Sequence, residues 1–129
     1  MIKKTPKQLK AKLWKVFSEY IRRRDSGTCF TCGKQMDWKE AHAGHYIPRS
    51  VGGLDLYFDS RNVNCQCPGC NVFRHGNLTI YALRLQEKYG KDILQTLDKL
   101  KGVNKWTRQD YETRIEDYKR KLEKLNVIS

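Results

Sequence analysis

Two Cys-x-x-Cys pairs constrain this chain more than any other feature of its sequence. The pairs are Cys29 with Cys32 and, about 35 residues later, Cys67 with Cys70. Four thiolates at this spacing can bind one tetrahedral zinc ion, with zinc–sulfur distances of about 2.3 Å. We therefore predict a structural zinc site that holds both ends of the intervening segment together. The alternative is a set of reduced, buried cysteines without a metal.

The remaining cysteine, Cys65, fits neither pair and is predicted to be a small buried residue; the alternative is that it replaces Cys67 as a ligand. The number of cysteines is odd, and the sequence has no apolar signal segment and no run of about 20 apolar residues. These features favour a reduced, cytoplasmic setting without membrane association. The length of 129 residues predicts a single domain. We expect an N-terminal helix within 1–26, a zinc-bound core over 27–90 and C-terminal helices over 91–129.

The chain is strongly basic, with a formal net charge of +12 at pH 7. Binding one zinc ion through four thiolates would leave the charge strongly positive. Such an excess in a small chain indicates a polyanionic partner, most often nucleic acid, because neutralising phosphates releases counterions. The alternative is a basic surface that serves only solubility. Charge alone indicates neither sequence specificity nor catalysis.

Helices are predicted at both ends of the chain. Residues 5–8 combine a threonine cap, a proline at the first helical position and a glutamine three residues after the cap, and apolar residues at helical spacing follow. This pattern predicts a helix over 6–24. Thr107 and Asp110 open a second long helix with an apolar stripe. The stripe is expected to pack on the N-terminal helix, or on a copy of itself in a homodimer.

The segment between the cysteine pairs has a different pattern, which makes the expected fold class α+β. Residues 40–65 predict a β-hairpin with a long loop, in which residues 46–57 form short strands around a turn. Three helical stretches are expected after it: one directly after the second cysteine pair, one that begins at Asn77 or Thr79 and ends at Gly90, and one that begins at Asp92 and ends at Gly102.

A zinc ion held by four cysteines has no open position and cannot activate water, so any reaction needs other residues. The candidates are His45 in the predicted hairpin, Asn62 on its return strand, and Asn71 with His75 on the helix that follows. Residues four apart on a helix share a face, so Asn71 and His75 could bind one metal ion. A histidine base beside such a metal suits phosphodiester hydrolysis. The alternative for His45 taken alone is a surface or capped histidine.

The motifs taken together resemble the HNH endonuclease motif, a ββα-metal hairpin and helix within a treble-clef zinc fold. That likeness lies in residues 44–53, 61–63 and 67–71. Over roughly residues 15–125 the chain is more closely similar to the NinG (Rap) recombination nucleases of lambdoid phages. The segments of closer likeness are 43–46, 61–63, 66–67, 70–71 and 76–78, together with Tyr81, Trp106 and Thr107.

The resemblance implies roles for single residues. His45 stands at the general-base histidine of HNH enzymes, and Asn62 stands at the asparagine that orients it. Asn71 and His75 stand at ligand positions for a catalytic Mg2+ or Mn2+ ion, and the paired cysteines stand at structural Zn2+ positions. The family is associated with phage recombination and with Mg2+-dependent cleavage of branched DNA such as Holliday junctions and D-loops. Recombination proteins as partners and the host-cell cytoplasm are implied with it.

The chain departs from the pattern at two places. Many HNH enzymes carry an Asp or His ligand just before the base histidine, where this chain has Gly44. The missing ligand is expected from His42, Asp55 or Asp59. A basic N-terminal extension with cysteines is also absent from this sequence, so a junction-recognising part is expected to be missing or to lie in the C-terminal helices.

Three functions therefore remain open from the sequence. The first is a Mg2+-dependent endonuclease for branched DNA, which the chain-long resemblance favours. The second is an HNH nuclease of a general or restriction type, with the same catalytic residues and a different substrate. The third is a non-catalytic zinc module that binds DNA or a recombination protein, which the glycine before His45 keeps open.

Overall fold

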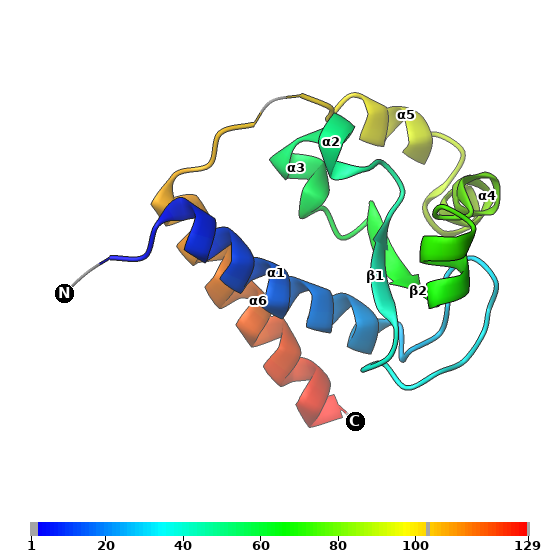
Figure 1. Cartoon of the computed structure of the whole chain (residues 1–129), viewed down its shortest axis with the longest axis horizontal. Helices are drawn as coiled ribbons and strands as arrows, with labels where there is room; N and C mark the ends of the chain where they lie inside the picture. The colour runs from blue at the N-terminus through cyan, green and yellow to red at the C-terminus, as the bar shows by residue number, and fades with distance from the viewer. Residues whose placement is uncertain (1–2, 103, 129) are drawn as a thin grey trace.

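A computed structural model describes residues 3–102 and 104–128 and has a mixed α+β fold, as expected (Figure 1). An antiparallel hairpin of β1 (His42–His45) and β2 (Val63–Gln66) lies among the helices. No helix in the described ranges is long and apolar enough to cross a membrane. The helical elements are α1 (Pro6–Arg24), α2 (Arg49–Gly52), α3 (Leu54–Tyr57), the π-helix η1 (Gly69–Phe73), α4 (Leu78–Tyr89), α5 (Ile93–Asp98) and α6 (Arg108–Ile128).

Both long helices begin where their sequence signals predict. At α1, the Thr5 amide donates to Gln8 Oε1 at 2.9 Å, and the Gln8 amide donates to Thr5 Oγ1 at 3.2 Å. At α6, Thr107 and Asp110 exchange the same pair of bonds, at 2.8 and 3.1 Å. Each reciprocal pair satisfies backbone donors that the first helical turn leaves free. The bounds predicted for the first helix, 6–24, are confirmed.

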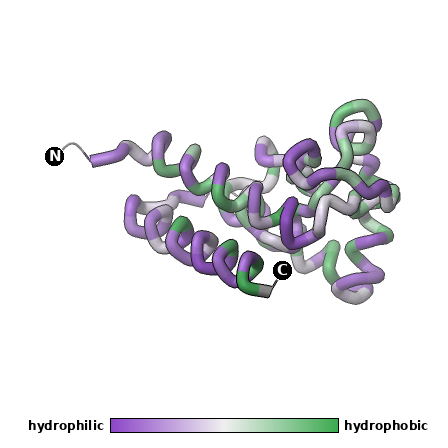
Figure 2. Tube along the Cα trace, turned by 90° about the horizontal axis from the view of Figure 1, so that it is seen from below, coloured by the Kyte–Doolittle hydropathy of each residue, from purple (hydrophilic) through white to green (hydrophobic). Residues whose placement is uncertain are grey.

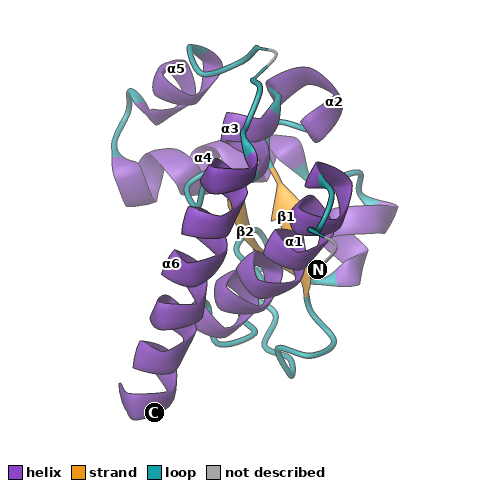
Figure 3. Ribbon diagram, turned by 90° about the vertical axis from the view of Figure 1, so that its left-hand side faces the viewer, coloured by secondary structure: helices purple, strands orange, loops and turns teal. Residues whose placement is uncertain are grey.

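The helices α1 and α6 lie side by side and run in the same direction (Figures 2 and 3). Their starts are joined by a bond from Arg108 Nε to the Lys4 carbonyl at 3.2 Å, and near their ends Arg23 donates to Asn126. The predicted packing of the C-terminal stripe on the N-terminal helix is therefore confirmed. One core cluster contains the buried side chains of both helices: Leu9, Leu13, Phe17, Ile21, Tyr111, Ile115 and Tyr118.

The expected pairing within residues 40–65 is confirmed, with His42 opposite Gln66 and His45 opposite Val63. The short strands expected over 46–57 are wrong, because this stretch forms the helical turns α2 and α3. The sequence pattern favours strands through its branched and aromatic residues, but contacts with a distant segment decide otherwise. Gly53 has φ 80° and packs against the backbone of residue 102, whose amide donates to the Gly52 carbonyl.

The later helices keep their predicted positions but not their predicted caps. Gly90 ends α4 with φ 98°, as its sequence position indicates, whereas α5 ends at Asp98, before Gly102. The residues before α4 and α5, Asn77 and Asp92, make no side-chain cap bond. Asn77 instead directs its amide nitrogen toward a cysteine sulfur, which ties the start of α4 to the cysteine cluster described below.

The α1–α6 core gives a stability prediction. Phe17 is fully buried and makes edge contacts with Phe58 and Tyr118, at ring-centroid distances of 5.6 and 4.9 Å. Phe17→Ala should lower the free energy of unfolding by about 3–5 kcal/mol, because it leaves a cavity in the packed core. The matched control is Phe73→Ala, since Phe73 is 79% exposed and its loss should change stability by less than about 0.5 kcal/mol. Denaturant unfolding measures both, and equal losses would contradict the described core.

Candidate functional site

The four paired cysteines gather at one point. Their sulfur atoms all lie within 4.8 Å of one another, and the sulfurs of Cys32 and Cys67 are 3.7 Å apart. A tetrahedron of sulfurs at about 2.3 Å from a central zinc ion has edges of about 3.8 Å, so the cluster has the size that zinc needs. The predicted ligands Cys29, Cys32, Cys67 and Cys70 therefore form a candidate zinc site.

Hydrogen-bond donors surround these sulfurs. The amide of Cys32 donates to Cys29 Sγ at 3.5 Å, and the amide of Cys70 donates to Cys67 Sγ at 3.4 Å. Asn77 Nδ2 lies 3.6 Å from Cys70 Sγ. Donors of this kind favour the thiolate form, which is the form that binds a metal. Each Cys-x-x-Cys turn thus supplies a backbone amide as well as two sulfurs.

Cys65 lies outside the cluster, as predicted. Its side chain is fully buried on β2, and burial raises the pKa of its thiol to about 12. Its backbone amide donates to Asp25 Oδ2 at 2.9 Å. The residue therefore acts as a small buried group of the hairpin.

A separate cavity of about 420 Å³ brings together three of the predicted site residues, His45, Asn71 and His75. They come from β1, from η1 and from the turn after η1. The second candidate catalytic residue, Asn62, does not line this cavity and is fully buried nearby. The other lining residues are Trp14, Pro48, Arg49, Tyr57 and Gly76.

The His45 ring is held in one tautomer by its hydrogen bond. Its Nε2 atom lies 3.0 Å from the Tyr57 carbonyl oxygen, which can only accept, so Nε2 carries the proton and Nδ1 keeps a free lone pair. The ring stacks on Tyr57 and on Trp14, with centroids 4.8 and 5.4 Å away. Burial, together with the charge of Arg49, lowers the pKa of His45 against the effect of the Tyr57 bond. His45 is therefore suited to act as a neutral base.

Asn62 does not contact the His45 ring but bonds to the backbone segment that does. Its Oδ1 accepts from the Ile47 amide at 2.9 Å, and its Nδ2 donates to the carbonyls of Ile47 and Leu56, both at 3.0 Å. These bonds hold the two ends of the segment that connects β1 to α3. Because α3 ends at Tyr57, whose carbonyl accepts from His45, the bonds of Asn62 and the His45 ring are connected through this backbone segment.

Asn71 and His75 reach the same cavity, although not as neighbours on one α-helix. The expected helix is a π-helix that ends at Phe73, and His75 follows it with a left-handed backbone, φ 51°. The turn is closed when the Gly76 amide donates to the Cys70 carbonyl at 2.8 Å. His42, the third tentative metal ligand, does not line the cavity, but its Nδ1 lies 3.0 Å from Asn71 Nδ2.

At Gly44 the sequence lacks the side chain expected to bind a metal, and the structure places the Gln66 side chain there. A Cβ atom at residue 44 would lie 1.9 Å from Gln66 Oε1 and 2.9 Å from Asn71 Oδ1, so another side chain fits there only if these two amide groups shift. Gln66 is fully buried, and its Nε2 donates to the Gly76 carbonyl at 2.8 Å. Its Oε1 has no hydrogen-bond partner within the described chain. Two amide oxygens thus face the space that a residue-44 side chain would occupy.

The family model for Bacteriophage Lambda NinG protein matches residues 2–127. The chain belongs to the NinG family. Over 107 residues it is 30% identical to protein ninG of Escherichia phage 933W, 31% to that of Salmonella phage P22 and 29% to that of Escherichia phage lambda. Each match covers 82% of this chain and 52% of the relative, so the chain spans about half the length of these curated NinG proteins. No solved structure matches the chain significantly.

The two aspartates that the sequence suggested as metal ligands in place of a side chain at Gly44, Asp55 and Asp59, have partners elsewhere in this NinG-family chain. Asp55 Oδ1 accepts from Trp106 Nε1 at 2.9 Å, and Asp59 pairs with Arg61 at 2.8 Å. Neither lines the cavity with His45. Within the described residues, the cysteine cluster is the group of three or more His, Cys, Asp or Glu whose ligand atoms come close together.

Among the cavity residues without a predicted role, Trp14 and Arg49 lie close to His45. Trp14 lies on the N-terminal helix, where nothing local indicates a contact with His45. Arg49 brings a positive charge to the cavity and donates to the Tyr57 hydroxyl at 3.2 Å. Arg49 follows His45 by four residues, and this spacing was the one sequence signal for their proximity. It indicates nothing in the strand that the sequence predicts for this stretch.

The cysteine cluster generates a prediction about metal content. If the four thiols hold one zinc ion, the purified chain should contain about one zinc, and Cys67→Ala should lose both the metal and the folded state, because zinc binding and folding are coupled. Cys65→Ala is the control and should keep the zinc, because Cys65 lies outside the cluster. Elemental analysis and circular dichroism measure the two effects. A folded, zinc-free Cys67→Ala protein would reject this ligand set.

Proposed function

We propose that this chain is a metal-dependent DNA endonuclease of the HNH type, acting on branched recombination intermediates such as Holliday junctions or D-loops. The observation that carries the proposal is a cavity in which the neutral His45 base, the Arg49 cation and Asn71 meet. Membership of the NinG family and the net charge of +12 support a nucleic-acid substrate.

His45 is proposed as the general base. Its Nδ1 atom has the free lone pair and could take the proton from a water molecule that attacks a phosphodiester. Positioned bases of this kind contribute about 10²–10⁴-fold to rates. Asn62 is the positioning residue for this base, through the segment that it bonds between Ile47 and Leu56. Arg49 would attract the anionic phosphate into the cavity.

The second component of the proposal is a Mg2+ or Mn2+ ion. Amide oxygens are among the ligands that these hard cations accept. Gln66 Oε1 is buried beside Asn71 Oδ1 without a hydrogen-bond partner among the described residues, and a bound cation would supply that partner. Asn71 and His75 would hold the ion, with Gln66 in place of the side chain missing at Gly44 and His42 behind Asn71. The bound ion would neutralise charge on the phosphate and on the leaving oxygen.

The cysteine cluster has a different part in this proposal. A Zn2+ ion on four thiolates is closed to water, so it would hold the hairpin and η1 in place without taking part in the reaction. We place the protein, with DNA as its partner, in the cytoplasm of the host cell. We also propose a homodimer, because cleavage of a junction cuts two strands. Contacts with recombination proteins belong to the same proposal, because other proteins carry out the other steps of recombination.

The substrate part of the proposal is tested by comparing DNA structures. Linear duplex, single strand and a four-way junction should be incubated with the protein in Mg2+ or in EDTA. We expect cleavage of the junction in Mg2+ alone and tighter binding of the junction than of the duplex. Affinity should fall steeply with salt, with a log–log slope near −0.9 per phosphate neutralised on duplex DNA. Equal binding and cleavage of junction and duplex would favour a general or restriction-type HNH nuclease.

The catalytic part rests on His45. His45→Ala should lose about 10²–10⁴-fold in rate with unchanged zinc content and DNA affinity. Asn62→Ala should lose less, because Asn62 acts through the backbone. Asn71→Ala and His75→Ala should raise the Mg2+ concentration needed for half-maximal rate. Because the base must be unprotonated and its pKa is lowered, the rate should rise with pH through a midpoint below about 6.5, the ordinary histidine value.

One result would decide against catalysis at this site. If His45→Ala cleaved junctions at the wild-type rate across a pH series, the base would be wrongly assigned. The non-catalytic zinc module would then be the better proposal, with any residual cleavage due to a contaminant.

A further inference from the structure

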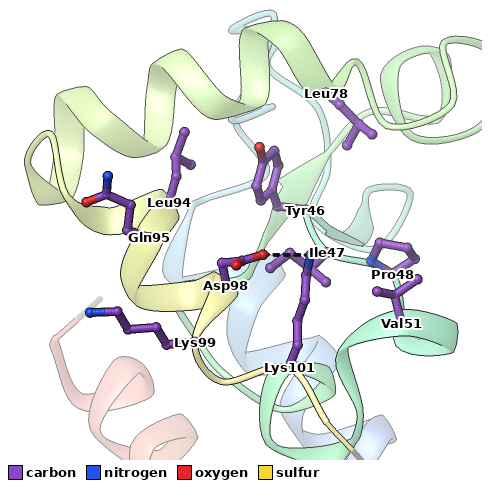
Figure 4. A pocket seen from close by; sticks show the side chains of 10 residues that line it. All are labelled: Tyr46, Ile47, Pro48, Val51, Leu78, Leu94, Gln95, Asp98, Lys99 and Lys101. Carbon is purple, nitrogen blue, oxygen red and sulfur yellow. Dashed lines mark ion pairs between the residues drawn. The ribbon is translucent and has the colours of Figure 1, made fainter.

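Figure 4 shows a second hollow, of about 840 Å³. It shares Pro48 with the cavity that contains His45. We call it the groove. Its sides come from the segment after β1, from α2, from the start of α4 and from α5 with the residues after it. The lining residues are Tyr46, Ile47, Pro48, Val51, Leu78, Leu94, Gln95, Asp98, Lys99 and Lys101.

The groove is apolar and firmly supported. Ile47 belongs to a buried core cluster, and Tyr46 and Leu94 pack against that cluster. Two further lining side chains are exposed although they are apolar: Val51 is 54% exposed and Leu78 is 45% exposed. Within the described chain nothing covers them. Exposed apolar surface gathered in a hollow usually marks a binding site.

The groove and the His45 cavity are adjacent. Pro48 lines both, and Tyr46 directly follows His45 in the chain. On the other side, Gly76 lines the cavity and Leu78 lines the groove. A DNA strand with a phosphate beside His45 would therefore have its neighbouring nucleotide at the groove.

The charges at the groove suit a nucleotide. Lys101 pairs with Asp98 at 2.7 Å, which neutralises the carboxylate, as the dashed line in Figure 4 shows. Lys99, at the rim, has no ion pair within the described residues, so it adds a positive charge that can meet a phosphate. The Gln95 side chain offers hydrogen-bond groups to a base edge. An aromatic ring, here Tyr46, accepts the face of any base.

We propose that the groove binds an unpaired nucleotide next to the scissile phosphate. Bases within a duplex are stacked and paired and cannot enter such a site without being unstacked, whereas bases at a branch point are single-stranded or less firmly stacked and enter at a lower cost. The groove would thus favour branched over linear DNA. This inference rests on the proposed nuclease function and adds the part of the substrate that the groove recognises.

The test compares two leucines of the same helix. Leu78 of α4 lines the groove, whereas Leu83 of α4 is 51% exposed and lies outside it. Leu78→Glu should weaken binding of a fluorescent oligothymidylate and of a four-way junction by about tenfold, since a carboxylate in the groove repels phosphates and replaces apolar surface that a base would cover, and should leave linear duplex binding unchanged. Leu83→Glu adds the same charge and should change none of the three. Fluorescence anisotropy in EDTA measures affinity without cleavage.

A second pair of variants keeps the test valid if Leu78→Glu fails to fold by circular dichroism. Lys99→Gln should reduce the salt dependence of single-strand binding by about 0.7 in the log–log slope, the value for one phosphate. Lys91→Gln, at an exposed lysine of the α4–α5 connection outside the groove, should not.

The outcomes separate this inference from the proposed function. Equal weakening of all three DNA substrates by Leu78→Glu, or no weakening of any, would overturn the nucleotide site while leaving junction cleavage by the wild-type protein intact. If Leu78→Glu weakened binding of none of the substrates, a partner protein would be the better candidate for the groove. If the wild-type chain bound no DNA at all, the proposed nuclease and the nucleotide site would fail together.

Discussion

The sulfurs of Cys29 and Cys32 meet those of Cys67 and Cys70 within 4.8 Å, and this contact joins the loop after α1 to the end of the hairpin. The loop is also bonded to the hairpin, because the Phe30 amide donates to the Cys65 carbonyl at 2.7 Å. Since β2 pairs with β1, the cluster fixes the position of His45 as well. Loss of the cluster would release η1 and the hairpin together, and with them the segments that carry His45, Asn71 and His75.

The position of the His45 ring depends on three separate parts of the chain. Trp14 of α1 and Tyr57 of α3 stack on its ring, and Asn62, just before β2, holds the segment that ends in α3. Because α1 is packed on α6, the long helices act as a support for the site as well as a core. The two stacked rings remove water from the imidazole, which lowers its pKa against the effect of the bond to the Tyr57 carbonyl, and that carbonyl selects the tautomer.

Gly44 and Gln66 are two sides of one arrangement. Residue 44 has no side chain, and the Gln66 amide occupies that space from the opposite strand, with an oxygen that lacks a partner among the described residues. A buried, unpaired acceptor is costly in a folded protein unless a ligand or ion uses it. Gly44 therefore leaves space for the Gln66 oxygen. The lack of a side chain at residue 44 does not by itself argue against the proposed metal-dependent reaction.

The sequence alone determined the features that arise from neighbouring residues. Thr5 with Gln8 and Thr107 with Asp110 specify helix starts, Gly90 a helix end, and the cysteine spacing the ligand set, because caps, turns and short ligand loops involve residues a few positions apart. Only the tertiary structure decided the helical turns over 46–57, the π-helix before His75, the Tyr57 bond to His45 and the Gln66 oxygen beside Gly44. These depend on contacts between segments far apart in the chain, such as the backbone of residue 102 against Gly53, and no local pattern reports the energy of those contacts.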